Sequence, residues 1–345
     1  MNHLGEIRKD YFSDEFVIIK TKETKKIKRK INKECEYCPG NEDKTIPADM
    51  VLVQSEGSLI RTADEEGEPV KDWCIRAFQE KNPIVTTEPE RSFGDHPLYS
   101  EPGFGHHYIV IATPNHKESL DKISLDQWIN VLISIQEKSR WLYSQKGVSY
   151  VSIYSSTKNG SEQNDGHSHF NLVTLPRIPP IIEKEANNVK QSINEFGLCP
   201  MCRILNIEMG GPRQIIATDL FFAFTPWASS KEFEFWIFPK KHQTSILKVS
   251  QTELEDLAIV LRSCLGGLSK SLKNVDYTIV FHMSSEKKTT KQLHWHIEIY
   301  PKTDRNNEGI ELASGINSND VSPEKAAEIL SLATRKQIAE LLGVS

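Results

Sequence analysis

The chain has 345 residues, of which 38% are hydrophobic and 26% are charged, and this composition excludes disordered, low-complexity and collagen-like proteins. Its length predicts about two domains, and its formal net charge of −5 argues against a general nucleic-acid coat. Six cysteines are too few for a disulfide scaffold. We expect a cytoplasmic protein with neither membrane nor nucleic acid as a partner, because no apolar run is long enough to span a bilayer and the first residues lack a signal-peptide pattern.

The first half of the chain predicts strands around one long helix. A polar, acidic stretch over 40–70 has weak periodicity and predicts a loop or an insertion. Ser124 and Gln127 form a capping-box pattern at the start of an amphipathic helix. Alternating apolar residues predict strands over 73–78, 106–114 and 148–156.

The second half repeats this order of elements. The Pro-rich segment 176–180 ends the first half, and 181–197 predicts a connecting helix. Ser250 and Glu253 form a second capping-box pattern, and Ser322 is the N-cap of a last amphipathic helix. Strands are predicted over 220–226, 233–239 and 275–285. We therefore predict an α+β fold of two tandem duplicated units, each an antiparallel sheet with a long helix, with domains spanning 1–185 and 190–345.

Cysteines and histidines follow one order in both halves. Each half has a Cys-x-x-Cys pair, then a lone histidine shortly after a proline, then a His-x-His pair, and the lone histidine precedes the His-x-His pair by an almost equal interval in each. The first set is Cys35, Cys38, His116, His167 and His169; the second is Cys199, Cys202, His242, His294 and His296. Two independent sets would not be expected to agree so well, so the repeat indicates a shared structural role.

These sets suit zinc, which takes four nitrogen or sulfur ligands in a tetrahedron. We predict a first zinc on Cys35, Cys38, His116 and His167, and a second on Cys199, Cys202, His242 and His294, which makes about two zinc ions per chain. A thioredoxin-type redox pair is the usual alternative for Cys-x-x-Cys, but it favours the start of a helix in a βαβ unit, which neither pair fits well.

His169, the second histidine of the first His-x-His pair, is not needed as a zinc ligand and is available for catalysis. Residues i and i+2 of a strand share a face, so His167 and His169 lie side by side. One can hold a metal while its neighbour faces a cleft, and imidazole attacks phosphorus well at neutral pH. His169 is thus a candidate nucleophile; the alternative is an ordinary polar residue on a sheet.

Many segments, in order, resemble the galactose-1-phosphate uridylyltransferase branch of the histidine-triad superfamily. They are EIRKDYFSDEFVII, CEYCPGNE, RAFQEKNPIV, GHHYIVIATPNHKESL, GHSHFNL, FTPWASSKEFEFWIFPKKH, HWHIEIYPK and GIELASGINSNDVSPEKAAEIL. The resemblance implies a pseudo-symmetric fold of two histidine-triad-like halves. It also implies ping-pong chemistry, in which His169 attacks the α-phosphorus of a nucleoside-diphosphate sugar and releases sugar 1-phosphate. The residues that match family positions near the substrate are Arg8, Arg76, Asn82, Asn159 and Gly160.

The chain departs from the family pattern in three places. Asn171 stands where the family motif has the longer Gln, and Ser161 lies further before His167 than the family's serine, so both are weaker candidates for phosphate contacts. The second metal site of the bacterial uridylyltransferases resembles a Glu with three His. Its nearest matches here are Glu185, His282, His294 and His296. The Cys199 and Cys202 pair instead resembles the two-zinc branch that includes plant ADP-glucose phosphorylase, so we favour the Cys2His2 set.

These features predict a zinc-containing nucleotidyltransferase that forms a nucleotidyl-histidine and passes the nucleotide to a sugar 1-phosphate. Such an enzyme belongs to carbohydrate metabolism, and specifically to galactose metabolism. One alternative is an ADP-sugar or dinucleoside-polyphosphate phosphorylase or hydrolase that uses the same histidine. Another is a non-catalytic zinc module that binds nucleotides. The base, the sugar and the acceptor stay open, and the resemblance implies a homodimer.

Overall fold

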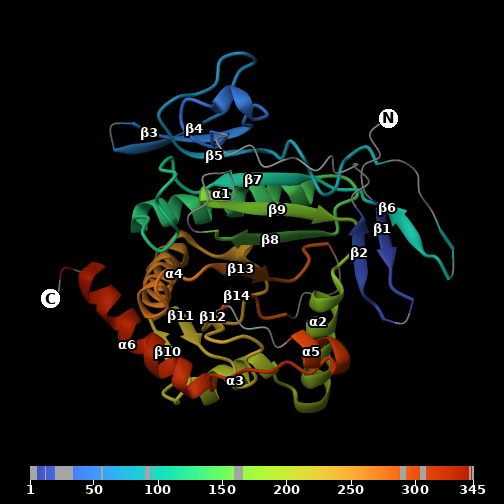
Figure 1. Cartoon of the computed structure of the whole chain (residues 1–345), viewed down its shortest axis with the longest axis vertical. Coiled ribbons are helices and arrows are strands. Elements are labelled where there is room, and N and C mark those ends of the chain that lie inside the picture. The colour runs from blue at the N-terminus through green and yellow to red at the C-terminus, as the bar shows by residue number, and fades with distance from the viewer. Residues whose placement is uncertain are drawn as a thin grey trace.

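The computed structural model describes residues 6–11, 13–19, 34–55, 57–89, 94–95, 97–158, 166–287, 293–303, 308–341 and 343. The predicted α+β class is confirmed (Figure 1). The helices are α1 (Leu125–Ser144), α2 (Pro180–Phe196), α3 (Pro200–Glu208), α4 (Gln251–Ser271), α5 (Glu308–Ser314) and α6 (Pro323–Leu341). The strands of the first half are β1 (Glu6–Lys9), β2 (Phe16–Ile19), β3 (Met50–Ser55), β4 (Ser58–Thr62), β5 (Trp73–Gln79), β6 (Ser100–Pro102), β7 (His107–Ile111), β8 (Tyr150–Ser156) and β9 (His169–Leu175). Those of the second half are β10 (Gln214–Ala217), β11 (Phe221–Phe224), β12 (Phe235–Pro239), β13 (Tyr277–His282) and β14 (His296–Pro301).

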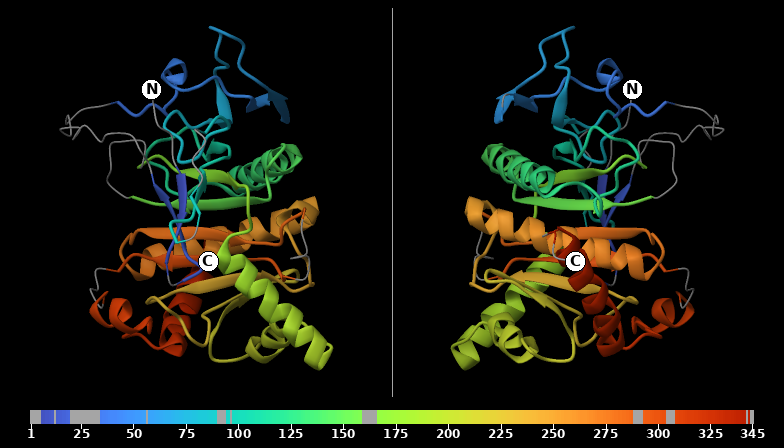
Figure 2. Two further views of the ribbon diagram at one scale, coloured as in Figure 1. Left: turned by 90° about the vertical axis from the view of Figure 1, so that its right-hand side faces the viewer. Right: turned by 90° about the vertical axis from the view of Figure 1, so that its left-hand side faces the viewer.

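The described strands form a large sheet of 11 strands and a small one of three. The large sheet has the order β10-β11-β12-β14-β13-β8-β9-β7-β5-β3-β4, and the small one has the order β2-β1-β6. Neighbouring strands pair antiparallel, as in β8 with β13, where Ser156 lies opposite Thr278. The sequence predicts a sheet for each half, and this pairing joins the two half-sheets edge to edge (Figures 1 and 2).

The duplication predicted from the sequence is visible in the order of elements. The first half runs β7-α1-β8-β9 and the second runs β12-α4-β13-β14. Both long helices pack on one continuous apolar core, which contains Trp128 of α1 and Leu261 of α4. The Gln136 amide also donates to the carbonyls of Ile246 and Val249, across the junction between the halves. The proposed boundaries at 1–185 and 190–345 stay a prediction, because one core spans both units.

The two long helices begin differently, although both carry a capping-box pattern. The Ser250 side chain accepts from the Glu253 N–H, and the Glu253 carboxylate accepts from the Ser250 N–H, so this box is complete. Ser124 also accepts from the Gln127 N–H. The Gln127 side chain, however, donates to the carbonyls of Cys74 and Ala112. The first box is therefore only half formed, because its glutamine ties the helix to the sheet instead.

Of the loop or insertion predicted over 40–70, the loop is wrong for residues 50–55 and 58–62, which form two strands. Met50–Ser55 and Ser58–Thr62 form the antiparallel pair β3 and β4 at one edge of the large sheet. The apolar run that begins at Met50 is buried, whereas all five residues of β4 are exposed. An exposed edge strand lacks the apolar alternation that the sequence prediction relied on. The connecting and last helices are found where the sequence predicts them, as α2 and α6.

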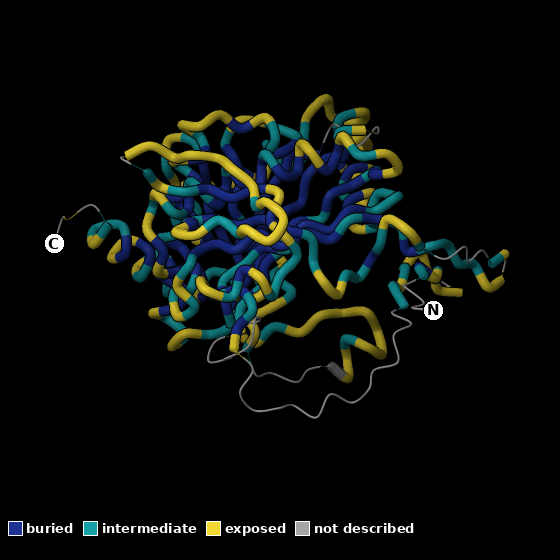
Figure 3. Tube along the Cα trace, turned by 90° about the horizontal axis from the view of Figure 1, so that it is seen from above, coloured by how far each residue is buried: buried dark blue, intermediate teal, exposed yellow. Residues whose placement is uncertain are grey.

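Buried residues lie along the strands in the middle of the molecule, with exposed residues in the surrounding loops (Figure 3). Cys264 is part of the main core, as expected, and Cys74 packs against it. Within the described ranges, no helix combines the length and apolar character that crossing a membrane requires.

Candidate functional site

The first predicted set of cysteines and histidines is gathered at one point. Cys35 and Cys38 lie on a turn, His116 follows β7, and His167 lies just before β9. Their four ligand atoms all lie within 4.8 Å of one another. The Cys35 sulfur lies 3.6 Å from His167 Nδ1 and the Cys38 sulfur 3.5 Å from His116 Nδ1. These are the four residues that the sequence assigns to a first zinc.

The tautomer of His167 suits a metal ligand. Its Nε2 lies 2.7 Å from the carbonyl oxygen of Thr113. Because a carbonyl only accepts, Nε2 carries the proton and the Nδ1 lone pair faces the thiols. Burial lowers the pKa of His167 to about 4, which keeps the ring neutral. Burial also raises the pKa of Cys35 to about 12, so a cation bound here would displace a proton.

The second predicted set is also gathered, with the same internal geometry. Cys199 is the N-cap of α3 and Cys202 lies in its first turn. The Cys202 sulfur lies 3.4 Å from His242 Nδ1 and 3.6 Å from His294 Nδ1. His294 Nε2 lies 2.8 Å from the Pro239 carbonyl oxygen, at the end of β12, just as His167 reaches the carbonyl after β7. The two clusters are therefore equivalent parts of the duplicated unit.

The alternative ligands of the second site form a separate cluster. Glu185 of α2, His282 of β13, and His296 and Glu298 of β14 offer ligand atoms within 4.8 Å of one another. His294 does not join them, because it faces the cysteines. His282 Nδ1 lies 2.8 Å from Glu185, and His296 Nε2 lies 3.3 Å from Glu298. Glu298 was not among the residues predicted from the sequence, although its position two residues after His296 on a strand places both on one face.

His169, the candidate nucleophile, is the first residue of β9 and is half-buried. Its Nδ1 lies 2.7 Å from the His167 carbonyl oxygen, so Nδ1 carries the proton and the Nε2 lone pair points away from the backbone. Tyr37, between the two cysteines of the first cluster, sets its ring edge-on to the His169 ring, with centroids 5.5 Å apart. The turn that carries the cysteines thus also contacts the candidate nucleophile.

Three further side chains that sequence reasoning did not select are linked to His169 or to Asn171, two residues after it. The Tyr37 hydroxyl donates to Glu80. Glu80 also accepts from the backbone N–H of the exposed Asn82. His107 of β7 lies 2.9 Å from the Asn171 side chain. Only the alternation of β7, which places His107 on the same face as His169 and Asn171, could have indicated one of them.

The remaining predicted substrate residues are placed less uniformly. Arg8 is exposed on β1 of the small sheet and pairs with Glu6. Arg76 is buried, and its guanidinium pairs with both carboxylate oxygens of Asp64, at 3.0 Å and 2.5 Å. Arg76 is thus held in a buried ion pair, and its role near the substrate stays a prediction. The predicted positions Asn159, Gly160 and Ser161 lie outside the described residues.

The histidine equivalent to His169 has different surroundings. His296 also places Nδ1 near the carbonyl two residues before it, at 3.1 Å. It is only 2% exposed. The ring of Phe238 stacks on it, with centroids 4.4 Å apart. Its Nε2, the atom that would attack phosphorus, faces Glu298. His296 is therefore covered, whereas His169 is not.

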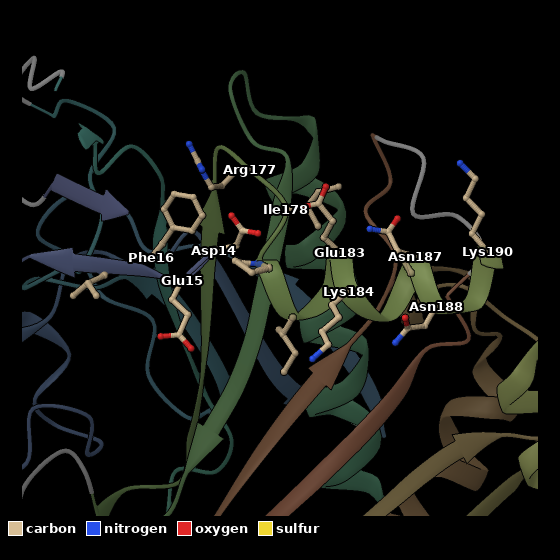
Figure 4. A pocket seen from close by; sticks show the side chains of 14 residues that line it. Asp14, Glu15, Phe16, Arg177, Ile178, Glu183, Lys184, Asn187, Asn188 and Lys190 are labelled. Atoms are coloured by element: carbon tan, nitrogen blue, oxygen red, sulfur yellow. The ribbon is translucent and has the colours of Figure 1, made fainter. Parts of the chain in front are cut away.

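A large groove of about 1180 Å³ lies elsewhere, between β2 and α2 (Figure 4). Arg177 lies over the ring of Phe16 at its rim, 4.2 Å from the ring centroid. None of the site residues that the sequence predicts lines this groove.

Comparison with known proteins confirms the predicted resemblance. No family model matches the chain. It is 25% identical to ADP-glucose phosphorylase of Arabidopsis thaliana over 95% of this chain and 93% of that protein. It is 24% identical to galactose-1-phosphate uridylyltransferase of Thermotoga maritima, over 94% and 97% respectively.

Two solved structures share the fold over nearly their whole length. A uridylyltransferase structure matches with a TM-score of 0.80 and 23% identity, covering 96% of this chain and 99% of the other. The ADP-glucose phosphorylase of Arabidopsis thaliana, solved with bound ADP-glucose, matches with a TM-score of 0.71 and 24% identity, covering 95% and 98%. The fold is therefore that of these enzymes.

Proposed function

We propose that this protein is a nucleotidyltransferase that acts on nucleoside-diphosphate sugars through a covalent nucleotidyl-histidine on His169. The observation that carries the proposal is the 2.7 Å contact between His169 Nδ1 and the His167 carbonyl oxygen. It fixes the proton on Nδ1 and leaves the Nε2 lone pair for attack on phosphorus. Full-length similarity to a uridylyltransferase and to an ADP-glucose phosphorylase supports the same chemistry.

The reaction divides into two displacements at the α-phosphorus. In the first, His169 Nε2 forms the N–P bond and the P–O bond to the sugar phosphate breaks, so sugar 1-phosphate leaves with the bonding pair. In the second, a phosphate oxygen of the acceptor forms a new P–O bond, the N–P bond breaks, and Nε2 recovers its lone pair. The His167 carbonyl stabilises the positive charge that develops on the imidazole ring.

Zinc fits both Cys2His2 clusters, and we propose one ion at each. Each cluster offers two thiols and two imidazole nitrogens within 4.8 Å. In His167 and His294, Nδ1 faces the thiols and the Nε2–H group donates to a backbone carbonyl, which is the usual arrangement around a zinc-bound histidine. Bound zinc would supply a structural cross-link between each cysteine turn and its histidines.

The acceptor distinguishes the two enzyme candidates. A sugar 1-phosphate, as in galactose metabolism, would make the protein a hexose-1-phosphate nucleotidyltransferase. Inorganic phosphate or water would make it a phosphorylase or hydrolase of ADP-sugars or dinucleoside polyphosphates. The similarity to a plant ADP-glucose phosphorylase favours keeping this second candidate. A non-catalytic zinc module would not need a nucleophile at His169.

We further propose a homodimer and a cytoplasmic location. Six free cysteines, four of them in metal-binding geometry among the described residues, suit a reducing compartment.

The experiment is incubation with UDP-, ADP- and GDP-sugars radiolabelled in the α-phosphate, each with and without phosphate or a sugar 1-phosphate. The proposal predicts acid-labile label on the protein that the correct acceptor removes. H169N should take no label, whereas the matched control H106N, at a histidine packed on Trp141, should label like the unchanged protein. Protein that takes no label from any of the nucleotide sugars would contradict the proposal.

A further inference from the structure

His107 occupies an unusual position for a polar residue of a central strand. It is the first residue of β7, only 7% exposed, and lies on the same face of the sheet as His169 and Asn171. Its Nε2 lies 2.9 Å from Asn171 Oδ1. Its Nδ1 lies 3.4 Å from the backbone nitrogen of Ile84, in the loop that follows β5. Both ring nitrogens therefore face a protein partner.

These two contacts determine which ring nitrogen of His107 carries the proton. A backbone N–H only donates, so Nδ1 of His107 accepts from Ile84 and carries no proton. The proton of the neutral ring is then on Nε2, which donates to Asn171 Oδ1. A buried donor needs this partner, so the amide of Asn171 is held with its oxygen toward His107. Its NH2 group is turned away from β7.

Asn171 lies two residues after His169 on the same face of β9. A phosphoryl group attached to His169, as the proposed function requires, would therefore lie on the face that carries Asn171. An amide NH2 held beside His169 is a donor for a phosphoryl oxygen. Asparagine has a short side chain with few conformations, but its amide can still rotate by half a turn and present oxygen instead of nitrogen. An oxygen there would repel the phosphate.

We propose that His107 is a positioning residue that fixes the Asn171 amide so that its NH2 group donates to the phosphoryl group transferred to His169. The proposal rests on the proposed function, since it assigns the donor that faces the transferred phosphate. The same ring also binds the loop of Ile84, which carries Asn82, to the start of β7. His107 thereby joins two of the segments predicted to contact the nucleotide.

A purely structural role for His107 predicts a different outcome. Its removal would then lower stability and affect all reaction parameters together, without regard to Asn171. A positioning role acts through Asn171 alone, so its effect disappears when Asn171 is already gone. The two roles are separated by a double-mutant cycle on the rate of the first transfer step.

The test compares H107F, H107Q, N171A and the double variant H107F/N171A with the unchanged protein, by single-turnover labelling of His169 with ADP-glucose or UDP-glucose. We expect N171A to slow labelling by about 10²-fold, the order found when one donor to a reacting group is removed. We expect H107F to slow it about 10-fold and the double variant to match N171A. H107Q, whose amide can accept from Ile84 and donate to Asn171, should stay within about 3-fold of the unchanged rate. H106F is the matched control and should not change the rate.

Thermal unfolding of each variant shows whether a slower labelling rate reflects a loss of folded protein. If H107F does not fold, H107N, whose side chain is too short to bridge Ile84 and Asn171, replaces it in the comparison with H107Q. Labelling of H107F at the unchanged rate, a double variant whose loss is the product of the two single losses, or an equal loss in H107Q and H107F would overturn the proposal. Absence of label in the unchanged protein would instead refute the proposed function.

Discussion

The two halves place a histidine at the same point of the same unit, and these two histidines differ in burial: His169 is half-buried and His296 is almost fully buried. His169 and His296 each begin a strand and each direct Nδ1 to the carbonyl two residues earlier. In the first half the ring meets the edge of Tyr37 and stays half-buried. In the second half Phe238 stacks on the ring and Glu298 faces its Nε2. The duplicated backbone supplies the imidazole geometry twice, and the neighbouring side chains decide where chemistry can occur.

The largest expected effect is the loss of turnover when the nucleophile is replaced. H169N should reduce turnover of the correct nucleotide sugar by more than about 10³-fold, because the proposed covalent intermediate forms on the Nε2 atom that the substitution removes. Steady-state turnover with the unfolding temperature measured in parallel checks this. Turnover within about 10-fold of the unchanged protein would show that another residue attacks the phosphorus.

The next effect separates the two proposed zinc sites. C35S and C199S should each remove about one zinc ion per chain by metal analysis. C35S should also slow labelling by more than about 10-fold, because its turn carries Tyr37 against His169. C199S should stay within about 3-fold, because its cluster lies in the half whose histidine is covered. Equal losses of labelling in the two variants would contradict the difference between the halves.

Removal of the covered histidine should affect stability and not labelling. H296N deprives the buried Glu298 carboxylate of a partner. The free energy of unfolding should fall by about 1–3 kcal/mol, the usual cost of an unsatisfied buried polar group. Denaturant unfolding measures this, and labelling per folded molecule should be unchanged. A selective loss of labelling would show that His296 contributes to the reaction.

The last two variants distinguish the two helix starts, and E253Q has the smallest expected effect. E253Q keeps an acceptor at the N-terminus of α4 and should change the free energy of unfolding by less than about 0.5 kcal/mol. Q127E completes the capping pattern of α1 but replaces a donor to two carbonyls with an acceptor. It should destabilise the protein by about 1–3 kcal/mol, as measured by denaturant unfolding. A stabilising Q127E would contradict the account of the first box.

Most of the fold follows from patterns that repeat along the chain. The order of cysteines and histidines, the two capping patterns and the periodicity of the long helices predict two equivalent α+β units, which the structure contains. The pairing of β8 with β13 could not be predicted, because edge-to-edge joining of two half-sheets leaves no local signal in either strand. β4 was missed because an exposed edge strand has no buried face to impose alternation.

The residues of the candidate site also divide into those that the sequence could predict and those that it could not. The two Cys2His2 sets could be predicted because ligand chemistry restricts them to cysteine and histidine at repeated spacing, and the structure gathers both. Tyr37 and Glu80 could not, since folding brings them together from separate segments. His107 could have been indicated only by the alternation of β7, because its contact with Asn171 depends on the pairing with β9. Arg76 was selected from a sequence motif, whereas its burial against Asp64 depends on the loop that follows β4.

The central claim is that the covalent intermediate forms on His169 and not on its equivalent in the second half. The direct measurement is peptide mass spectrometry of the protein after brief mixing with ADP-glucose or UDP-glucose and quenching at alkaline pH, where a phosphoramidate persists. The account predicts one adenylyl or uridylyl group on the peptide that contains His169, and none on the peptide that contains His296. Turnover without any adduct, or an adduct on another residue, would contradict it.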